Sequence, residues 1–438
     1  MTILYWFRQD HRLSDNPALA QACTMAEHRS EPLLPVTLLP TEQTTDWGFT
    51  RLGEHRKAYE AQSLIALAGS LRSLGSDLHQ PKTPGCEGLI ELARQVNASC
   101  IVCESIHAPY EIDEIKTLTD AGIKVETIEQ SALLPHDSLP FETSKTPTVF
   151  SDFRRQVEKA KSLPRTPLAR PATLPPLPDG ITGAVPYTAE IARPIRPTLD
   201  ARSALPYQQE PWQGGEASGQ AHLARYFAST LPGQYKASRN GLIGTDYSTK
   251  FSPWLATGAV SAAQIWQALQ NHEATYGGND GTYWIWFELL WRDHFRLMMQ
   301  RFGRRLFRYA GLAKPPHQMV NTPPKHNQQG FDRWRHGLTG HAFIDAGMRE
   351  LAATGYLSNR MRQNVASYLI HDLGCDWRAG AAWFEHCLVD FDVHSNQGNW
   401  AYIAGVGTDP RGGRRFNPDK QAHDYDRDAS YRNLWSAD

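Results

Sequence analysis

Strand-like and helix-like segments alternate along the first 130 residues of the chain. Apolar runs typical of buried strands lie at 2–7 (TILYWF), 33–39 (LLPVTLL), 100–103 (CIVC) and 124–129 (KVETIE), with 76–80 (SDLHQ) as a further candidate. The segments between them predict helices that begin near Pro17 and cover 53–74, 86–96 and 111–121. This alternation predicts a doubly wound α/β domain over 1–130, with a parallel sheet covered on both faces. The sequence has no G-x-G-x-x-G after the first strand, which argues against an ordinary dinucleotide site there.

The rest of the chain changes character twice. At 438 residues the protein is too long for one typical core, so two or three domains are expected. Periodicity fades over 131–215, where proline is frequent, and this predicts a long linker with one short helix at 149–160. Helical patterns dominate from residue 216 onward, so 216–438 is predicted to be one all-α domain.

One helical stretch, 281–309, has an unusual mixture of side chains, and it predicts a single long amphipathic helix. Trp284, Glu288 and Trp291 are spaced three and four residues apart and therefore share a face. Indoles stack on bases, a carboxylate accepts a base-edge N–H, and arginines hold phosphates. The alternative is a structural helix with buried tryptophan and a solvated basic side. The polar remainder carries Arg292, Arg296, Arg301, Arg304, Arg305 and Arg308.

A second stretch, 245–261, gathers hydroxyl groups just ahead of Pro253 and a helical run. Hydroxyls, exposed amides and Lys250 at a helix start would suit a pyrophosphate. Locally, a simple capped turn explains the pattern better. The hydroxyl-bearing residues are Thr245, Ser248, Thr249 and Ser252.

A third stretch, 342–400, combines amides, arginines and paired carboxylates. Asn359 and Gln363 are four residues apart on a predicted helix. Asp390 and Arg362 are expected to form a buried pair, which is better evidence for a positioned site than for stability. The second carboxylate, Asp392, is more often a helix cap than a catalyst.

Composition limits the possible partners, metal content and location of the protein. The formal net charge is −1, so any nucleic-acid site must be a local basic patch. Thirteen tryptophans suggest stacking sites or an electron-transfer medium in addition to core. The six cysteines include a C-x-x-C at Cys100 and Cys103, but no second Cys or His pair lies at zinc spacing, so free thiols and no metal are expected. The N-terminus lacks a signal-peptide pattern and no run approaches a membrane span, which favours a cytoplasmic protein.

Several long motifs make the chain resemble the photolyase/cryptochrome family, and most closely its DASH cryptochromes. The resemblance covers nearly all 438 residues. It implies an α/β domain, a long linker and a helical domain that holds FAD in a U shape. The motifs are WFRQDHRLSDNPAL (6–19), YKASRNGLIGTDYSTKFSPWLATG (235–258), FELLWRDHFR (287–296), FIDAGMRELAATGYLSNRMRQNVASYL (343–369), and then DWRAGAAWFE, SNQGNWAYIAGVGTDPR and FNPDKQAHDYD.

The resemblance also implies roles for individual residues around the flavin. Arg362 and Asp390 match the ion pair beside the isoalloxazine, Asp392 matches a ring contact, and Asn396 faces flavin N5. Contacts with the flavin nucleotide, largely its phosphates, are implied for Tyr235, Ser248, Thr249, Lys250, Phe251 and Ser252.

For DNA, the resemblance implies a pocket that receives a flipped-out lesion. Glu288 matches a glutamate that hydrogen-bonds the damaged pyrimidine beside the cofactor, and Trp291 matches the aromatic residue packed against it. Amides at Asn359 and Gln363, where enzymes for (6-4) photoproducts need a pair of histidines, favour cyclobutane pyrimidine dimers. Tyr402 replaces a second pocket tryptophan, which fits a preference for single strands. The DNA-facing set is Arg292, Asn359, Arg360, Gln363, Tyr402 and Arg411.

Two departures from the family pattern affect light-driven reduction and signalling. The family's chain of three tryptophans maps onto Trp400, Trp377 and a third position near Pro324, where this sequence has no tryptophan; Trp334 follows ten residues later. Another exit residue, or inefficient photoreduction, is therefore expected. The sequence ends at NLWSAD, without the long tail of signalling cryptochromes, and this disfavours tail-based signalling.

The antenna chromophore stays open. Glu111 aligns with a glutamate that binds methenyltetrahydrofolate in related proteins, but the surrounding HAPYEIDE differs. Folate, a deazaflavin and no antenna are all compatible with the sequence.

The function expected from the sequence is light-driven repair of cyclobutane dimers, with single-stranded DNA preferred, by a monomer. The main alternative is a blue-light photoreceptor without repair activity. A third possibility, a nucleic-acid-binding module without flavin, would be excluded by a yellow preparation with flavin absorbance.

Overall fold

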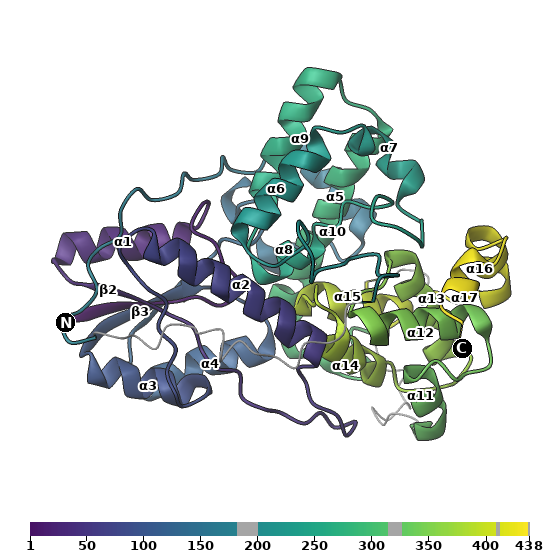
Figure 1. Cartoon of the computed structure of the whole chain (residues 1–438), viewed down its shortest axis with the longest axis horizontal. Coiled ribbons are helices and arrows are strands. Elements are labelled where there is room, and N and C mark those ends of the chain that lie inside the picture. Colours follow the sequence, from purple (N-terminus) through teal and green to yellow (C-terminus); the bar gives the residue numbers. More distant parts are fainter. Residues whose placement is uncertain (182–199, 314–325, 409–411, 437–438) are drawn as a thin grey trace.

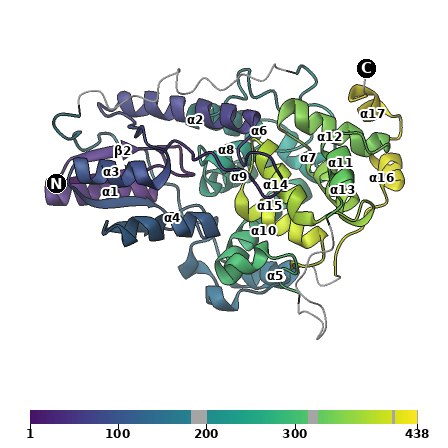
Figure 2. The same cartoon turned by 90° about the horizontal axis from the view of Figure 1, so that it is seen from below.

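A computed structural model of the chain describes residues 1–181, 200–313, 326–408 and 412–436. The sheet and its helices lie at one end of the molecule, and the later helices form the other end (Figure 1). Seen from below, helix α2 runs along one side from the sheet toward the helical part (Figure 2).

The sheet has four parallel strands in the order β2-β1-β3-β4. In the register, Leu4 of β1 lies opposite Leu34 on one side and Ile101 on the other. Strands β1 and β2 and most of β3 are buried on both faces, as expected inside a parallel sheet, whereas the edge strand β4 is only partly buried or exposed. The strands are β1 (Thr2–Trp6), β2 (Leu33–Val36), β3 (Ala98–Glu104) and β4 (Val125–Ile128).

Two helices cover each face of the sheet, so the predicted doubly wound fold is confirmed. Ile3 and Tyr5 face the layer of α1 (Pro17–Arg29) and α2 (Glu54–Arg72). Leu4 and Trp6 face the layer of α3 (Gly85–Gln95) and α4 (Pro109–Asp120).

The expected strand at 76–80 is wrong as a full strand. Only His79 pairs there, in an isolated parallel bridge with Val36. Its N–H donates to the Pro35 carbonyl, and its carbonyl accepts from Thr37 N–H, both at 2.9 Å. Pro81 follows within two residues and has no N–H to continue a ladder.

The motif at 6–19 joins the sheet to the helical part. The Arg12 guanidinium donates to the Gly258 carbonyl at 2.8 Å. The Glu216 carboxylate accepts from the N–H groups of Leu13 (2.8 Å) and Ser14 (2.9 Å). Burying such groups is tolerable because each is hydrogen-bonded, so this motif is explained by domain docking.

The linker contains two 3-10 turns, η1 (His136–Ser138) and η2 (Thr143–Lys145), and helix α5 (Phe150–Ala160). The Asp293 carboxylate accepts from the N–H groups of Leu133 and Leu134, each at 2.8 Å. These bonds fasten the start of the linker to the long helix described next.

The helical part begins with α6 and is built around α10, which contacts α7, α15, α5 and α9. Its first helices are α6 (Glu216–Phe227), α7 (Leu231–Ser238), α8 (Ser252–Thr257), α9 (Ala262–Tyr276) and α10 (Asp280–Phe302). After α10 come η3 (Gly303–Phe307), α11 (Gln328–Arg335), α12 (Ala342–Thr354), α13 (Asn359–His371), α14 (Trp377–Cys387), α15 (Val393–Ile403), α16 (Pro418–Tyr425) and α17 (Ser430–Leu434).

The single helix expected over 281–309 is two elements. Asn279 begins α10 with a capping box, and the helix ends at Phe302. Gly303 then has a φ of +49°, a left-handed conformation that stops an α-helix and suits glycine. The remaining basic residues continue in the 3-10 turn η3.

Two glycines let helices approach α15 closely. A Cβ on Gly380 of α14 would lie 2.2 Å from the Trp400 ring. A Cβ on Gly398 would lie 2.2 Å from the Phe295 ring of α10. Both contacts position Trp400 and its helix at the bottom of the cavity described below.

Among the described residues, none of the helices combines the length and apolar character needed to cross a membrane.

Candidate functional site

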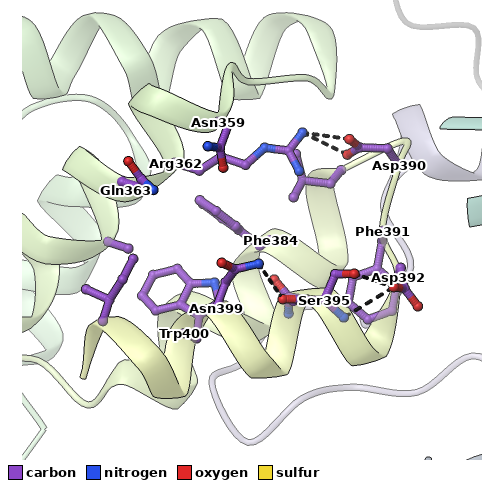
Figure 3. A pocket seen from close by; sticks show the side chains of 14 residues that line it. Asn359, Arg362, Gln363, Phe384, Asp390, Phe391, Asp392, Ser395, Asn399 and Trp400 are labelled. Atoms are coloured by element: carbon purple, nitrogen blue, oxygen red, sulfur yellow. Dashed lines mark hydrogen bonds and ion pairs between the residues drawn. The ribbon is translucent and has the colours of Figure 1, made fainter. Parts of the chain in front are cut away.

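A cavity of about 540 Å³ lies between α13, α14 and α15 (Figure 3). Ser358 caps α13 by accepting from Met361 N–H, and this places Asn359, Arg362 and Gln363 on the side of the helix that faces the cavity. Amide, carboxylate and aromatic side chains therefore line the same cavity. The lining residues are Asn359, Arg362, Gln363, Ala366, Phe384, Leu388, Asp390, Phe391, Asp392, Ser395, Asn396, Asn399, Trp400 and Ile403.

The expected ion pair between Arg362 and Asp390 is present at one end of the cavity (Figure 3). One Arg362 nitrogen lies 2.9 and 2.8 Å from the two Asp390 oxygens, and Nε donates to the Leu357 carbonyl at 2.8 Å. Burial would lower the pKa of Arg362, but Asp390 raises it, so the guanidinium stays charged.

Asp392 caps helix α15, as the sequence suggested for the second carboxylate. It accepts from the N–H groups of His394 and Ser395. Arg296 of α10 approaches it to 3.6 Å and His394 Nδ1 to 2.9 Å. Burial alone would raise the pKa of Asp392, yet Arg296 and His394 hold it well below its ordinary value. A permanent negative charge therefore lies on the cavity wall.

Asn396 and Trp400 project from α15 into the same space. The Asn396 Nδ2 donates to the Ala381 carbonyl at 3.0 Å, and Asn396 is part of the cavity lining. Trp400 is buried, and Phe384 packs against it edge-on at 5.0 Å between ring centroids.

Lys250 is buried, and among the described residues its Nζ has no hydrogen-bond partner. The Nζ lies 3.4 Å from the ring centroid of Tyr247 and 4.6 Å from that of Tyr356. Burial lowers its pKa well below the ordinary lysine value. A buried amine in this position suits a polar ligand, and Ser248, Thr249 and Ser252 beside it are only partly buried.

Helix α8, which follows this segment, has only six residues and no side-chain cap at its start. The His222 ring instead bonds the Thr249 carbonyl at 2.8 Å. Phe251 is buried against the His222 and Tyr226 rings. The hydroxyl-rich turn is thus held by aromatic packing and is not explained as a capped turn.

Glu288 forms an ion pair with Arg239. The same guanidinium lies 4.4 Å from the ring centroid of Trp284. Burial raises the pKa of Glu288, and Arg239 opposes that shift. Tyr235 lies buried close by, and its pKa is raised well above the ordinary value by burial and by Glu288.

Trp291 lies one turn further along α10 and points toward α15 and the linker. It stacks face to face on Phe150 of α5, with centroids 3.7 Å apart and planes at 10°. Tyr402 meets it edge-on at 5.8 Å, and the Tyr402 hydroxyl accepts from Arg414 at 2.6 Å.

The structure brings together some predicted site residues and separates others. Of the described residues, the cavity lining includes Asn359, Gln363, Asn396 and Trp400 but neither Glu288 nor Trp291. A polar chain links the two groups: Arg360 donates to Gln363 Oε1 at 3.1 Å and to Asn240 Oδ1 at 2.8 Å, and Asn240 follows Arg239.

Arg292, predicted to face DNA, has other surroundings. Arg292 donates to the Ser131 carbonyl at 2.6 Å, and burial lowers its pKa to about 10, so it is directed into the protein at the linker. Arg411 lies outside the described residues. Arg304, also on the predicted basic side, pairs with Asp113 of the α/β domain.

Trp377 is buried, and its Nε1 donates to the Tyr309 carbonyl at 3.0 Å. The third position near Pro324 lies outside the described residues. Trp334 is fully buried and lies edge-on to Trp400, with ring centroids 6.3 Å apart.

Glu111 lies on a second, larger cavity between the sheet and the helical part, with about 1690 Å³ of empty space. Its Oε2 is buried and has no hydrogen-bond partner in the part of the chain that the structure describes. Arg8 donates to the Glu111 carbonyl at 3.1 Å, and the Arg51 guanidinium lies 4.0 Å from the Tyr110 ring.

Comparison with known proteins fits this geometry. A family model described as DNA photolyase matches residues 3–175, and one described as the FAD binding domain of DNA photolyase matches residues 284–437. Cryptochrome DASH from Gloeobacter violaceus is 41% identical over 443 aligned positions, covering 99% of this chain and 85% of that protein. The chain belongs to the photolyase/cryptochrome family. Cryptochrome DASH from Xenopus laevis is 40% identical and covers 99% of this chain and 82% of its own length.

Solved structures of this family share the fold. The cryptochrome of Synechocystis sp. PCC6803 matches with a TM-score of 0.89 and 38% identity, over 99% of this chain and 88% of that one. A class III photolyase from Agrobacterium tumefaciens matches with a TM-score of 0.80 and 26% identity, over 99% and 86% of the two chains.

The helical part is accordingly an FAD-binding domain, and its residues fit that cofactor. The Lys250 Nζ has no hydrogen-bond partner among the described residues, and a pyrophosphate would give it one. The Arg362–Asp390 pair, Asp392 and Asn396 line the cavity and would give a flat ring polar contacts.

Sequence reasoning missed several residues of this site. Arg239, Phe150, Tyr247 and Tyr356 all contact residues predicted to be functional. Arg239 and Tyr247 lie inside the motif 235–258 and Tyr356 inside the motif 343–369, and these positions could have signalled their roles. Phe150, the stacking partner of Trp291, comes from a distant segment and left no local signal.

Proposed function

We propose that this protein is a light-driven photolyase that repairs cyclobutane pyrimidine dimers and prefers single-stranded DNA. The observation that carries the proposal is the pair of amides, Asn359 and Gln363, on the lining of the cavity that also contains Asn396 and Trp400. Amides hydrogen-bond bases but donate no proton as acids, which suits splitting of a cyclobutane ring and not acid-assisted repair of a (6-4) product.

Groups suited to a base are connected to this cavity through neighbouring residues. Glu288 and Trp284 contact Arg239, whose chain neighbour Asn240 connects to Gln363 through Arg360. Trp291 meets Tyr402 edge-on, and Tyr402 precedes Ile403 of the cavity lining. A carboxylate and aromatic faces around a cavity are what an extruded lesion needs.

FAD, when bound and reduced, supplies a photoexcited one-electron donor to the lesion. The chain's own residues bind and orient it. Lys250 and the hydroxyls of Ser248, Thr249 and Ser252 would hold the pyrophosphate. The Arg362–Asp390 pair and Asn396 would fix the ring, and the charge of Asp392 would set its electrostatic surroundings.

The preference for single strands rests on the cost of flipping. Extruding a lesion costs a few kcal/mol and costs least in unpaired DNA. Tyr402, whose hydroxyl binds Arg414, offers a smaller stacking face than a second indole would. This weaker stacking supports action on single-stranded DNA, in which no base pair has to be broken.

The second cavity is proposed to hold an antenna chromophore, with the buried Glu111 oxygen as its hydrogen-bond acceptor. Methenyltetrahydrofolate and a deazaflavin are both compatible. The structure of a photolyase from Sulfolobus tokodaii, 25% identical, is described with two FAD molecules and a novel light-harvesting cofactor.

Illumination of reduced protein with oligo-dT that contains dimers tests the proposal. Restored thymines on single strands, and slower repair of duplex DNA, are the expected result. An FAD-loaded protein that repairs neither substrate would favour the photoreceptor alternative. We propose a monomer in a reducing compartment such as the cytoplasm, which the six free cysteines support.

A further inference from the structure

The electron route into the flavin cavity has no indole at its expected outer end. Residues 314–325, KPPHQMVNTPPK, contain neither tryptophan nor tyrosine. The Trp377 Nε1 donates to the Tyr309 backbone carbonyl, and Tyr309 is partly buried. A tyrosine is harder to oxidise to a cation than an indole, so Tyr309 is a poor terminal electron donor for this branch.

A second indole contacts Trp400 from another direction. The Trp334 ring lies edge-on to Trp400 at 6.3 Å and stacks on Phe384 at 6.4 Å, with an interplanar angle of 18°. Trp334 is fully buried, and its Nε1 donates to the Val365 carbonyl at 2.9 Å. The hydrogen bond fixes the ring, so the contact with Trp400 is a preorganised one.

Aromatic rings continue from Trp334 toward the surface. Phe331 stacks on Trp334 at 5.9 Å, and Phe49 of the 41–53 loop stacks on Phe331 at 6.2 Å. Trp383 is the next ring in this series and meets Phe49 edge-on, with ring centroids 5.0 Å apart. Trp383 is also the chain neighbour of Phe384, so packing and backbone both connect it to Trp334.

Trp383 has the properties of an exit residue. It is only half-buried, and it stacks on His386 with centroids 5.0 Å apart and planes at 17°. The Arg335 guanidinium, 5.5 Å from the Trp383 ring, is paired with Asp332 at 2.8 Å, which offsets its charge.

We propose that Trp334 and Trp383 form the principal electron-supply branch to Trp400 in this protein, in place of the branch through Trp377. The inference rests on the proposed photochemistry of the bound flavin. One electron leaves Trp400 toward the photoexcited flavin, Trp334 refills Trp400, and Trp383 refills Trp334. A small thiol in solution then gives one electron to the Trp383 radical cation and releases its proton to solvent, and two of the resulting thiyl radicals combine as a disulfide. The phenylalanine rings carry no charge in this sequence.

The test compares light-driven flavin reduction, with a thiol donor, in W334F, W383F and W377F variants. We expect W334F and W383F to lose most of the rate, W377F to lose less, and W334F/W377F to lose all of it. Transient absorption should show the Trp400 radical decaying back without a long-lived tryptophan radical in W334F. If W377F loses most of the rate and W334F loses none, the proposal is overturned.

Two controls separate electron supply from folding. Trp435 is a buried indole of the same core cluster, and W435F should keep the wild-type rate. Trp47, a half-buried indole that packs on His326, provides a surface control as W47F. Full loss in W47F with no loss in W383F would overturn the exit assignment. All variants should keep the wild-type ratio of FAD to protein.

A readout independent of turnover is the map of oxidised tryptophan. Under dioxygen as oxidant and without thiol, illumination should place oxygen adducts on Trp383, detectable by mass spectrometry, and W334F should abolish them. Adducts that persist on Trp383 in W334F would contradict the branch. Dithionite-reduced W334F should repair dimers as well as the wild type does. If the reduced wild-type protein also fails to repair dimers, the proposed function is refuted and not the electron-supply branch.

Discussion

Arg239, at the end of α7, and Glu288 of α10 form an ion pair, with the same guanidinium stacked over Trp284. Burial raises the pKa of Glu288, and Arg239 opposes that shift. Under the proposed function, an extruded base donates an N–H to this carboxylate, which Arg239 holds in a defined position. Such a bond is worth more than a neutral one, roughly 1.5–3 kcal/mol.

We therefore expect Glu288→Ala to weaken lesion binding by about 10–100-fold, since each 1.4 kcal/mol is tenfold. FAD content should stay unchanged, because Glu288 is not among the described residues that line the flavin cavity. Gel-shift titration with a dimer-containing strand measures the affinity. Asp280→Ala removes an exposed pair with Lys236 on the same two helices and serves as control. Full repair by Glu288→Ala would place the lesion elsewhere.

Arg362→Ala should remove FAD and stability together. The substitution leaves Asp390 buried without its partner, which costs about 3 kcal/mol of unfolding free energy. Flavin absorbance per protein and thermal unfolding measure the two effects. Asp372→Ala breaks an exposed pair with Arg415 and should cost about 1 kcal/mol or less. Equal losses in the two variants would show that the Arg362–Asp390 pair has no special role.

Lys250→Met should affect the FAD-free and FAD-bound proteins in opposite directions. The charges that face Lys250 are Glu350, Arg362, Asp390 and Asp246, and burial still lowers its pKa well below the ordinary value. A base with a lowered folded pKa binds fewer protons in the folded state than in the unfolded one. Its contribution to stability therefore rises with pH between the folded and unfolded pKa values.

The FAD-free wild type should thus gain stability as pH rises through that window toward the ordinary lysine pKa, and Lys250→Met should lack this gain. The same variant should bind FAD about 10–100-fold more weakly, because it loses a charge-assisted bond to phosphate. Urea unfolding at several pH values and FAD titration of the stripped protein measure both. Unchanged FAD affinity would place the pyrophosphate away from Lys250.

The sequence predicted those features that depend on local pattern. Alternating apolar runs gave the doubly wound sheet, and two opposite charges in a motif-rich region gave the Arg362–Asp390 pair. Gly303 was a readable stop signal inside the stretch taken as one helix. The prediction of a strand at 76–80 was wrong because strand character in five residues does not ensure pairing partners.

Contacts between distant segments had no comparable signal. Arg239 meets Glu288 across 49 positions, and Phe150 covers Trp291 from a linker whose path the sequence did not define. Arg292 resembled its basic neighbours but is turned toward Ser131. Tertiary packing against other elements decides whether an arginine on a helix faces a ligand or the protein. Periodicity shows which residues share a helix face but not what lies opposite that face.

Trp400→Phe separates electron supply from repair. Trp400 lines the cavity, and Trp334 packs against its ring, so an electron supplied through Trp334 must pass through Trp400. Phenylalanine is not oxidised under these conditions, and we expect light-driven flavin reduction to be lost. Repair by chemically reduced protein needs no external electron and should stay near wild type. Parallel absorbance kinetics and repair assays measure the two activities, and undiminished photoreduction in the variant would mean that electrons reach the cavity without using α15.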